Sequence, residues 1–153
     1  MQVKQFAIPL AIVLSFGAGI AATLLVPGAI PAAYAGTAPL TPQVIDVGPM
    51  TYDNLPPNAG SQQRSVTLLS TANGTVSVQA GTVRKHTHQQ SEEVQYILEG
   101  SGTMWVGNER KDFKPGTLII IPRGTPHGGA NVAYKALAIK LPPAVTGDSQ
   151  YME

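Results

Sequence analysis

The residues best suited to chemistry are three histidines, at positions 86, 88 and 127, and a glutamate at position 93. On a β-strand, His86 and His88 would point to the same face, because side chains alternate. Imidazole suits zinc, copper, iron and nickel, and an added carboxylate also admits manganese. A His-x-His pair alone is a weak signal, because such pairs arise by chance and a core histidine is usually only hydrogen-bonded. The pattern is nevertheless compatible with one divalent transition metal.

The elements that must position these residues read as short β-strands. Runs rich in branched residues are separated by turn signals at intervals of about 8–12 residues, and no stretch shows helical periodicity. Asn73-Gly74 predicts a type I′ hairpin turn, and the apolar run 118–121 predicts a strand buried on both faces. The sequence therefore predicts an all-β fold, a closed or sandwiched antiparallel barrel, with strands at 65–69, 75–79, 82–88, 94–98, 103–106, 110–113, 118–121 and 134–141.

Glycines and prolines around the histidines give the pattern more weight. Two motifs of the cupin superfamily are matched, the first by Gly81, His86, His88, Glu93 and Gly100, and the second by Gly116, Pro122, Gly124, His127 and Asn131. The first motif departs from the family pattern only in having one residue fewer between Gly81 and His86. The chain thus resembles a small single-domain cupin, and the resemblance implies a cupin double-stranded β-helix, a jelly-roll-like barrel.

The resemblance also implies a metal site and a range of functions. By the family pattern, His86, His88, Glu93 and His127 converge inside the barrel on one divalent metal, which is Fe, Mn, Ni, Cu or Zn. The spacing to Gly100 selects Glu93 as the ligand rather than Glu92. Cupins with this ligand set include dioxygenases, oxalate decarboxylases and oxidases, sugar-phosphate isomerases and lyases, and small cupins usually form homodimers.

We expect a metal-dependent enzyme, leaning to an oxidoreductase or lyase, that acts on a small oxygen-rich organic compound. The alternative is a non-catalytic periplasmic module that binds a metal or a small ligand. Fold alone does not choose between these functions. A second cluster of polar side chains beside the metal ligands would favour the enzyme.

Two further residues are candidates for binding a substrate. Arg84 precedes His86 by two, so on a regular strand it would point inward with the histidines and could hold a carboxylate through two hydrogen bonds. The alternative for Arg84 is a position at the barrel mouth with its charged head in water. Gln95 follows Glu93 by two and is expected to point inward, as a hydrogen-bonding partner of a ligand or of the substrate.

The start of the chain reads as a targeting segment. Residues 1–35 have a short basic start, an apolar stretch and a final Ala33-Tyr34-Ala35, which is the layout of a secretory signal peptide cleaved before Gly36. The alternative is an uncleaved membrane anchor, because the apolar stretch is long enough to span a bilayer. Cleavage predicts a periplasmic or secreted bacterial protein. A Pro-rich lead-in is predicted at 36–60, the barrel at 61–142 and a C-terminal tail at 143–153. Within the lead-in, 44–47 is either a short edge strand or an extended segment.

Composition excludes several other classes of protein. The 153 residues contain no cysteine, which rules out disulfide scaffolds, thiolate nucleophiles and cysteine-bound zinc. Lys4 is the only charged residue before Asp46, and the rest of the chain has a net charge of zero. The chain therefore lacks the excess of basic residues that is typical of nucleic-acid-binding proteins. The expected partner is a small molecule, and a membrane only if residues 1–35 are retained.

Overall fold

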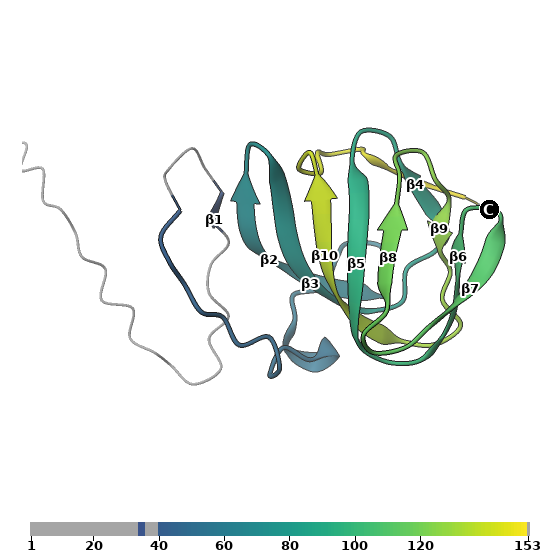
Figure 1. Cartoon of the computed structure of the whole chain (residues 1–153), viewed down its shortest axis with the longest axis horizontal. Coiled ribbons are helices and arrows are strands. Elements are labelled where there is room, and N and C mark those ends of the chain that lie inside the picture. Colours follow the sequence, from purple (N-terminus) through teal and green to yellow (C-terminus); the bar gives the residue numbers. More distant parts are fainter. Residues whose placement is uncertain (1–33, 36–39, 153) are drawn as a thin grey trace, which may run out of the picture.

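The protein is built from two antiparallel β-sheets that face each other, as a computed structural model of residues 34–35 and 40–152 shows (Figure 1). Residues 1–33, most of the predicted signal peptide, lie outside the described residues, as do residues 36–39 of the lead-in. In the described part, the only helix is a single 3₁₀ turn, η1 (Tyr52–Asn54). No helix there is long and apolar enough to cross a membrane. The prediction of an all-β fold, with strands arranged in two facing sheets, is confirmed.

The larger sheet has the strand order β1-β2-β3-β10-β5-β8. These strands are β1 (Tyr34–Ala35), β2 (Gln63–Thr71), β3 (Gly74–Gly81), β5 (Glu92–Glu99), β8 (Leu118–Ile121) and β10 (Tyr134–Leu141). All neighbours are antiparallel except β1, which pairs in parallel with β2. The predicted barrel strands of this sheet are present, each within a few residues of its expected bounds.

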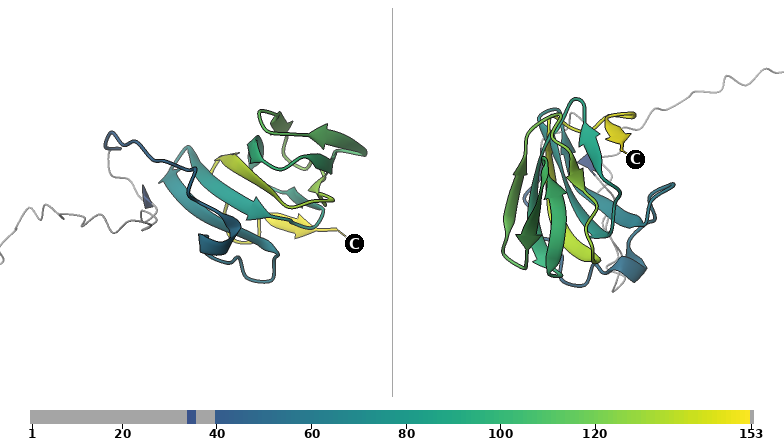
Figure 2. Two further views of the ribbon diagram at one scale, coloured as in Figure 1. Left: turned by 90° about the horizontal axis from the view of Figure 1, so that it is seen from below. Right: turned by 90° about the vertical axis from the view of Figure 1, so that its right-hand side faces the viewer.

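The smaller sheet has the strand order β11-β4-β9-β6-β7 and covers one side of the larger sheet (Figure 2). Its strands are β4 (His86–His88), β6 (Gly102–Val106), β7 (Glu109–Phe113), β9 (His127–Gly128) and β11 (Ser149–Tyr151). The sequence did not predict β11, which lies in the C-terminal tail and pairs with β4. The tail is therefore part of the sheet that carries the histidines.

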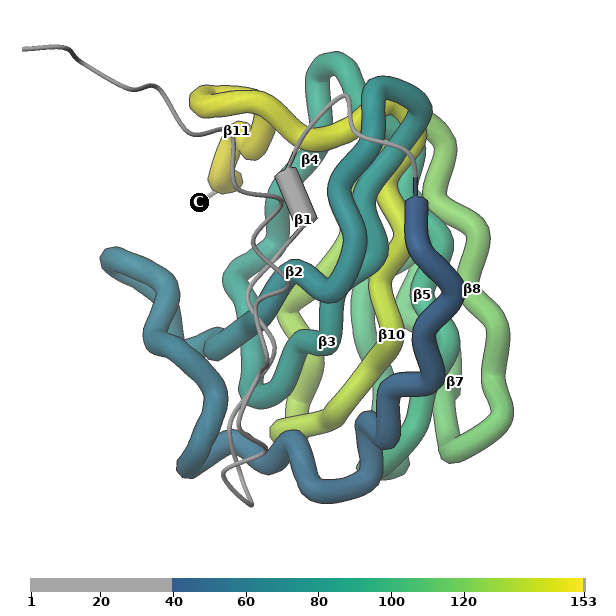
Figure 3. Tube along the Cα trace, turned by 90° about the vertical axis from the view of Figure 1, so that its left-hand side faces the viewer, coloured from purple at the N-terminus to yellow at the C-terminus, as the bar shows by residue number. Residues whose placement is uncertain are grey.

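Two hydrophobic clusters hold these layers. The cluster between the sheets consists of Ile97, Met104, Phe113, Ile119, Ile121, Tyr134 and Ala136. The second lies on the opposite face of the larger sheet, where Met50 and Leu55 of the lead-in cover Leu68, Val78 and Ala80. Figure 3 shows the lead-in crossing the larger sheet before it enters β2. Residues 44–47 form no strand, so the extended alternative for this segment is correct.

Three local predictions were wrong. The hairpin turn at Ala72-Asn73 is not type I′, because none of Ala72, Asn73 and Gly74 has a positive φ. The glycine at position 74 has a different role: it lets its strand approach Lys140, whose carbonyl oxygen would lie 2.7 Å from an added Cβ. Residues 118–121 are buried on one face only, because Ile119 and Ile121 join the cluster between the sheets, whereas the cluster on the outer face of the larger sheet does not extend to β8. The predicted strand at 82–88 is regular only from His86 onward, because residues 82–85 leave the ladder.

Candidate metal centre

Three imidazoles and one carboxylate meet between the two sheets. His86 and His88 come from β4, His127 from β9 and Glu93 from β5 across the barrel. Their candidate ligand atoms all lie within 4.8 Å of one another, and all four side chains are buried. The pairing of His86 with His127 in the β4–β9 ladder brings together two residues that are far apart in the sequence. The structure thus brings together the four residues predicted as ligands, in a group that could hold a metal ion.

The outer nitrogen of each histidine is held by an oxygen. His86 Nδ1 lies 2.8 Å from the carbonyl oxygen of Arg84, and His127 Nδ1 lies 2.9 Å from that of Thr125. Since a carbonyl can only accept, Nδ1 carries the proton in both rings, and the neutral ring turns the lone pair of Nε2 toward the centre. That is the tautomer in which a histidine binds a metal through Nε2.

Glu93 is oriented by two amides. Gln79 and Gln95 donate to its Oε1, at 3.3 and 3.0 Å. The other oxygen, Oε2, lies 2.9 Å from His88 Nε2 and 3.2 Å from His127 Nε2. One oxygen is therefore occupied by protein donors, and the other is presented to the imidazoles.

This arrangement fits a cation. A lone pair on His127 Nε2 faces a carboxylate oxygen, so two acceptors oppose each other at 3.2 Å unless the ring takes a second proton or a cation lies between them. A divalent metal removes this conflict, because both atoms become its ligands. Three imidazole nitrogens and one carboxylate oxygen suit a transition metal, and four protein ligands leave one or two positions for water or substrate on a five- or six-coordinate ion.

Burial shifts the protonation of these groups. It lowers the pKa of His86 to about 4, and the neighbouring His127 and His88 add to the effect. Burial would raise the pKa of Glu93, but the contacts with His127 and His88 and the charge of Lys140 hold it well below the usual value. His86 is thus neutral and Glu93 ionised at neutral pH, as metal binding requires.

A chain of polar side chains continues from Glu93 through the barrel interior. Gln63 donates to Gln79 at 2.6 Å, and the hydroxyl of Tyr134 donates to Gln95 at 3.3 Å. Gln95 points inward and is buried, as its position two residues from Glu93 predicted. Sequence reasoning missed Gln63, Gln79 and Tyr134. The only signal was the polar set at alternate positions of β3, Thr75, Ser77 and Gln79.

Arg84 does not join this group. Its side chain is exposed, and its guanidinium lies over the ring of Tyr151, 4.7 Å from the centroid. The expected inward direction is wrong, because it assumed a regular strand and β4 begins only at His86. The missing residue between Gly81 and His86 falls in this irregular stretch. Arg84 lies instead at the barrel mouth, which was the alternative position.

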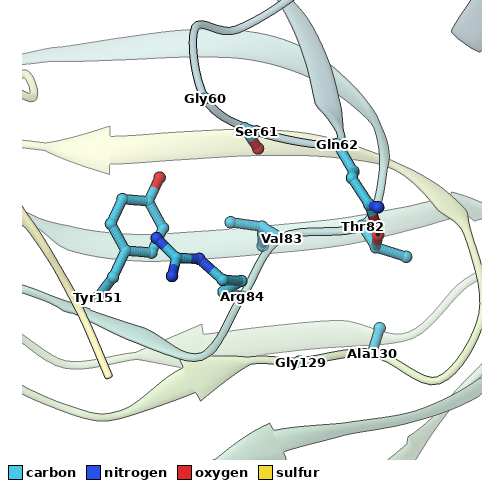
Figure 4. Close-up of a pocket in the computed structure, with 9 residues that line it drawn as sticks. All are labelled: Gly60, Ser61, Gln62, Thr82, Val83, Arg84, Gly129, Ala130 and Tyr151. Atoms are coloured by element: carbon cyan, nitrogen blue, oxygen red, sulfur yellow. Dashed lines mark hydrogen bonds between the residues drawn. The ribbon is translucent and has the colours of Figure 1, made fainter. Parts of the chain in front are cut away.

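Arg84 nevertheless lines a pocket of about 540 Å³ (Figure 4). The other lining residues are Gly60, Ser61, Gln62, Thr82, Val83, Gly129, Ala130 and Tyr151. The ring of Tyr151 lies 5.6 Å from that of His86, between centroids, and His86 is the most exposed of the four ligands, at 6%. The pocket therefore adjoins the metal-ligand group on its His86 side.

Comparison with known proteins agrees with this description. Residues 74–139 match the family described as "Cupin domain". An uncharacterized protein of Methanocaldococcus jannaschii is 42% identical over 71 residues, which are 44% of this chain and 57% of that protein. The chain thus matches little more than half the length of this curated relative.

Solved structures share the fold at low identity. The protein TT1209 of Thermus thermophilus is 22% identical with a TM-score of 0.53, and the match covers 66% of this chain and 98% of that one. A protein of Klebsiella pneumoniae with a double-stranded β-helix domain is 19% identical, with a TM-score of 0.54 and coverage of 67% and 95%. The nucleoside dehydratase Pac13 is 14% identical, with a TM-score of 0.53 and coverage of 61% and 80%.

Proposed function

Residues 74–139 match the family described as "Cupin domain", and from that match we propose that the protein is an exported, metal-dependent cupin enzyme for a small oxygen-rich organic compound. The observation that carries the proposal is the opposition of acceptor atoms at the centre of the barrel, where Nε2 of His127 faces Oε2 of Glu93. A divalent metal is the partner that fits these atoms. Two enzymes of this fold, the nucleoside dehydratase and an ectoine synthase, show that the fold can carry enzymes that act on small organic molecules.

The polar interior favours an enzyme over a purely structural metal site. A metal that only stabilised the packing of the two sheets would need its ligands but no further polar groups around them. Here Gln63, Gln79, Gln95 and Tyr134 extend the polar lining beyond the ligands, and burying such groups costs free energy unless they are hydrogen-bonded. This cluster is more than a purely structural metal site needs, and it supports an enzyme.

Different residues would orient the metal ligands, line the pocket and bind the charged group of such a compound. A bound metal would supply Lewis-acid polarisation of a substrate oxygen. Gln79 and Gln95 keep Oε2 of Glu93 turned to the centre, and Val83 and Tyr151 flank the pocket beside His86. Arg84 presents a positive charge at this pocket, which suits a substrate carboxylate. Hydroxy acids and uronates meet both requirements, whereas phenols offer an oxygen for the metal but no carboxylate for Arg84, and the reaction is an oxidation or an elimination.

Metal analysis tests the first half of the proposal. We expect the purified protein to hold about one divalent transition metal per chain, and His88→Ala to lose most of it, because His88 supplies one of the three nitrogens. Full metal content in His88→Ala, with the variant folded, would contradict the ligand assignment. Oxygen-uptake and elimination assays of the metal-loaded protein on a panel of acids, phenols and uronates test the second half. Tight binding of these compounds without turnover would instead favour the non-catalytic binding module.

Export is supported by the layout of residues 1–35. Cleavage after Ala35 would place the domain in the periplasm or medium. N-terminal sequencing of the exported protein should start at Gly36, and recovery of Met1 or Gln2 in the membrane fraction would show an anchor instead.

A further inference from the structure

A second buried carboxylate lies behind the metal-ligand group. Asp148, in the C-terminal tail, is 2% exposed, and its Oδ2 lies 3.1 Å from Nδ1 of His88. Its other oxygen, Oδ1, accepts hydrogen bonds from the backbone N–H groups of Gln90 at 2.6 Å and Ser91 at 3.4 Å. One oxygen thus fixes Asp148 to the loop between β4 and β5, and the other faces the histidine.

The tail is attached firmly enough to hold Asp148 in this place. The residues of β11 pair with β4, with Ser149 opposite His88 and Tyr151 opposite His86 (Figure 3). The backbone N–H of Gln89 donates to the carbonyl of Asp148 at 2.9 Å, and that of Met152 donates to the carbonyl of Lys85. Asp148 therefore belongs to the same rigid unit as the two histidines of β4.

His88 differs from the other two histidines in how its outer nitrogen is held. His86 and His127 each face a backbone carbonyl two residues earlier in the chain, which is local and uncharged. Nδ1 of His88 lies 3.1 Å from a carboxylate oxygen of the distant tail, Asp148 Oδ2, which has no hydrogen-bond partner of its own among the described residues, and the same nitrogen is hydrogen-bonded to the hydroxyl of Ser149 at 3.3 Å. A carboxylate behind a metal-binding histidine fixes the ring and raises its basicity as a ligand.

We infer that Asp148 is a positioning residue of the metal centre, which holds the proton on Nδ1 of His88 and so directs Nε2 to the metal. The inference rests on the proposed metal site, because it assigns Asp148 no function apart from that site. The backbone N–H groups of Gln90 and Ser91 can only donate, so Oδ1 of Asp148 accepts from them, and Oδ2 is left facing Nδ1 of His88 as an acceptor.

The variant Asp148→Asn separates this role from a purely structural one. Asparagine keeps one oxygen for the N–H groups of Gln90 and Ser91, so the β4–β5 loop remains capped. It replaces the other oxygen by an NH₂ group, which cannot accept from Nδ1–H of His88. We expect the dissociation constant for zinc, measured by chelator competition, to rise by roughly 10–100-fold, the usual effect of removing such a partner.

Two controls accompany this variant. Asp112→Asn removes the same charge from an exposed position on β7 and should leave zinc affinity unchanged. Ser149→Ala removes the other side-chain partner of His88 Nδ1 and should weaken zinc binding much less than Asp148→Asn does. A folded Asp148→Asn that binds zinc as tightly as the wild type would overturn the inference, as would a larger loss in Ser149→Ala.

A measurement on the wild-type protein covers the case in which Asp148→Asn does not fold. Nitrogen-15 spectra of the histidine rings in the zinc-loaded chain should show His88 with its proton on Nδ1 and zinc on Nε2. Zinc on Nδ1 of His88 would overturn the inference while leaving the metal site in place. A wild-type protein that binds no zinc or other divalent transition metal would overturn the proposed function itself, so the two failures can be told apart.

Discussion

Glu93 illustrates how single residues shape this site. Its two oxygens have different environments, because Gln79 and Gln95 bond to one and the imidazoles of His88 and His127 face the other. The carboxylate is therefore prepared to bind a metal through one oxygen. The second oxygen is linked through the amides to the rest of the polar interior, so a change at Gln79 or Gln95 would reach the metal through Glu93.

At the mouth of the site, Arg84 should affect ligand binding without affecting the metal. Its guanidinium lies at the pocket and makes no contact with the four ligand side chains that the structure records. Since Arg84 is exposed, Arg84→Ala should weaken binding of a carboxylate ligand by about 1 kcal/mol, the upper range for an exposed ion pair. Calorimetric titration of the metal-loaded protein, with metal content measured in parallel, checks this. Unchanged affinity for every anionic ligand would make Arg84 a surface residue only.

The protonation of His86 should make the metal-free protein sensitive to acid. Its pKa is about 4 in the folded state against an ordinary value of 6.5, so between these values the unfolded state binds more protons. The free energy of unfolding should therefore fall as the pH drops from 6.5 to 4, by up to about 3 kcal/mol from this group. Urea unfolding of the metal-free protein at several pH values should show a flatter profile for His86→Gln. An equally steep profile in that variant would assign the effect to other groups.

Sequence could predict the four candidate metal ligands and one supporting residue, Gln95, but not the supports that come from distant segments of the chain. The ligands form two motifs whose spacing is local, so His86, His88, Glu93 and His127 could be identified without the fold. Asp148 could not, because its place beside His88 depends on the β4–β11 pairing of distant segments. Arg84 was misplaced because alternation of side chains holds only within a regular strand, and residues 82–85 are irregular.

At the scale of elements, the ladder of β4 and β9 depends on the absence of a side chain at Gly128. Its φ is +93°, and an added Cβ would lie 2.9 Å from the carbonyl oxygen of Arg84 and 3.3 Å from Nδ1 of His86. Gly128→Ala should therefore both strain the backbone and displace the ring of His86. Zinc affinity should fall together with stability.

Gly107 is the matched control for this prediction. It also has a positive φ, +67°, but an added Cβ would meet nothing within 4 Å. Gly107→Ala should cost about 1–2 kcal/mol from the backbone alone, and Gly128→Ala should cost about 1–3 kcal/mol more from the clash. Urea unfolding of both metal-free variants measures the difference. Equal costs would show that the β4–β9 contact can relax around a methyl group.

The inner face of β3 shows why the polar interior escaped prediction. Alternation was visible in β3, but the apolar set, which includes Val78 and Ala80, faces the lead-in, and the polar set, which includes Gln79, faces the barrel. A sequence pattern identifies two faces of a strand and does not say which one lies inside a barrel. The apolar face of a strand usually lies inside the barrel. In β3 it lies outside, because Met50 and Leu55 of the lead-in cover it.

At the scale of the whole molecule, the outer face of β5 and β8 suggests how two copies would meet. Tyr96, Leu118 and Ile120 are 44%, 57% and 66% exposed, and the register pairs Tyr96 with Leu118 across the two strands. β8 also forms an edge of the larger sheet. An apolar patch next to an open strand edge favours association, so we expect a homodimer. Sedimentation at micromolar concentration should give a dimer, and Ile120→Lys should give a monomer. A monomeric wild type would contradict the expectation.

The position of Asp148 near the end of the chain has a consequence for the order in which the site is assembled. The ribosome synthesises His86, His88, Glu93 and His127 before Asp148. A nascent chain therefore contains all four candidate ligands while the carboxylate of Asp148 is not yet beside His88. An ion captured at that stage would meet a looser site than the finished one. Docking of the tail would then trap whichever ion was already present, and the metal found in the mature protein would record the supply at the place of folding.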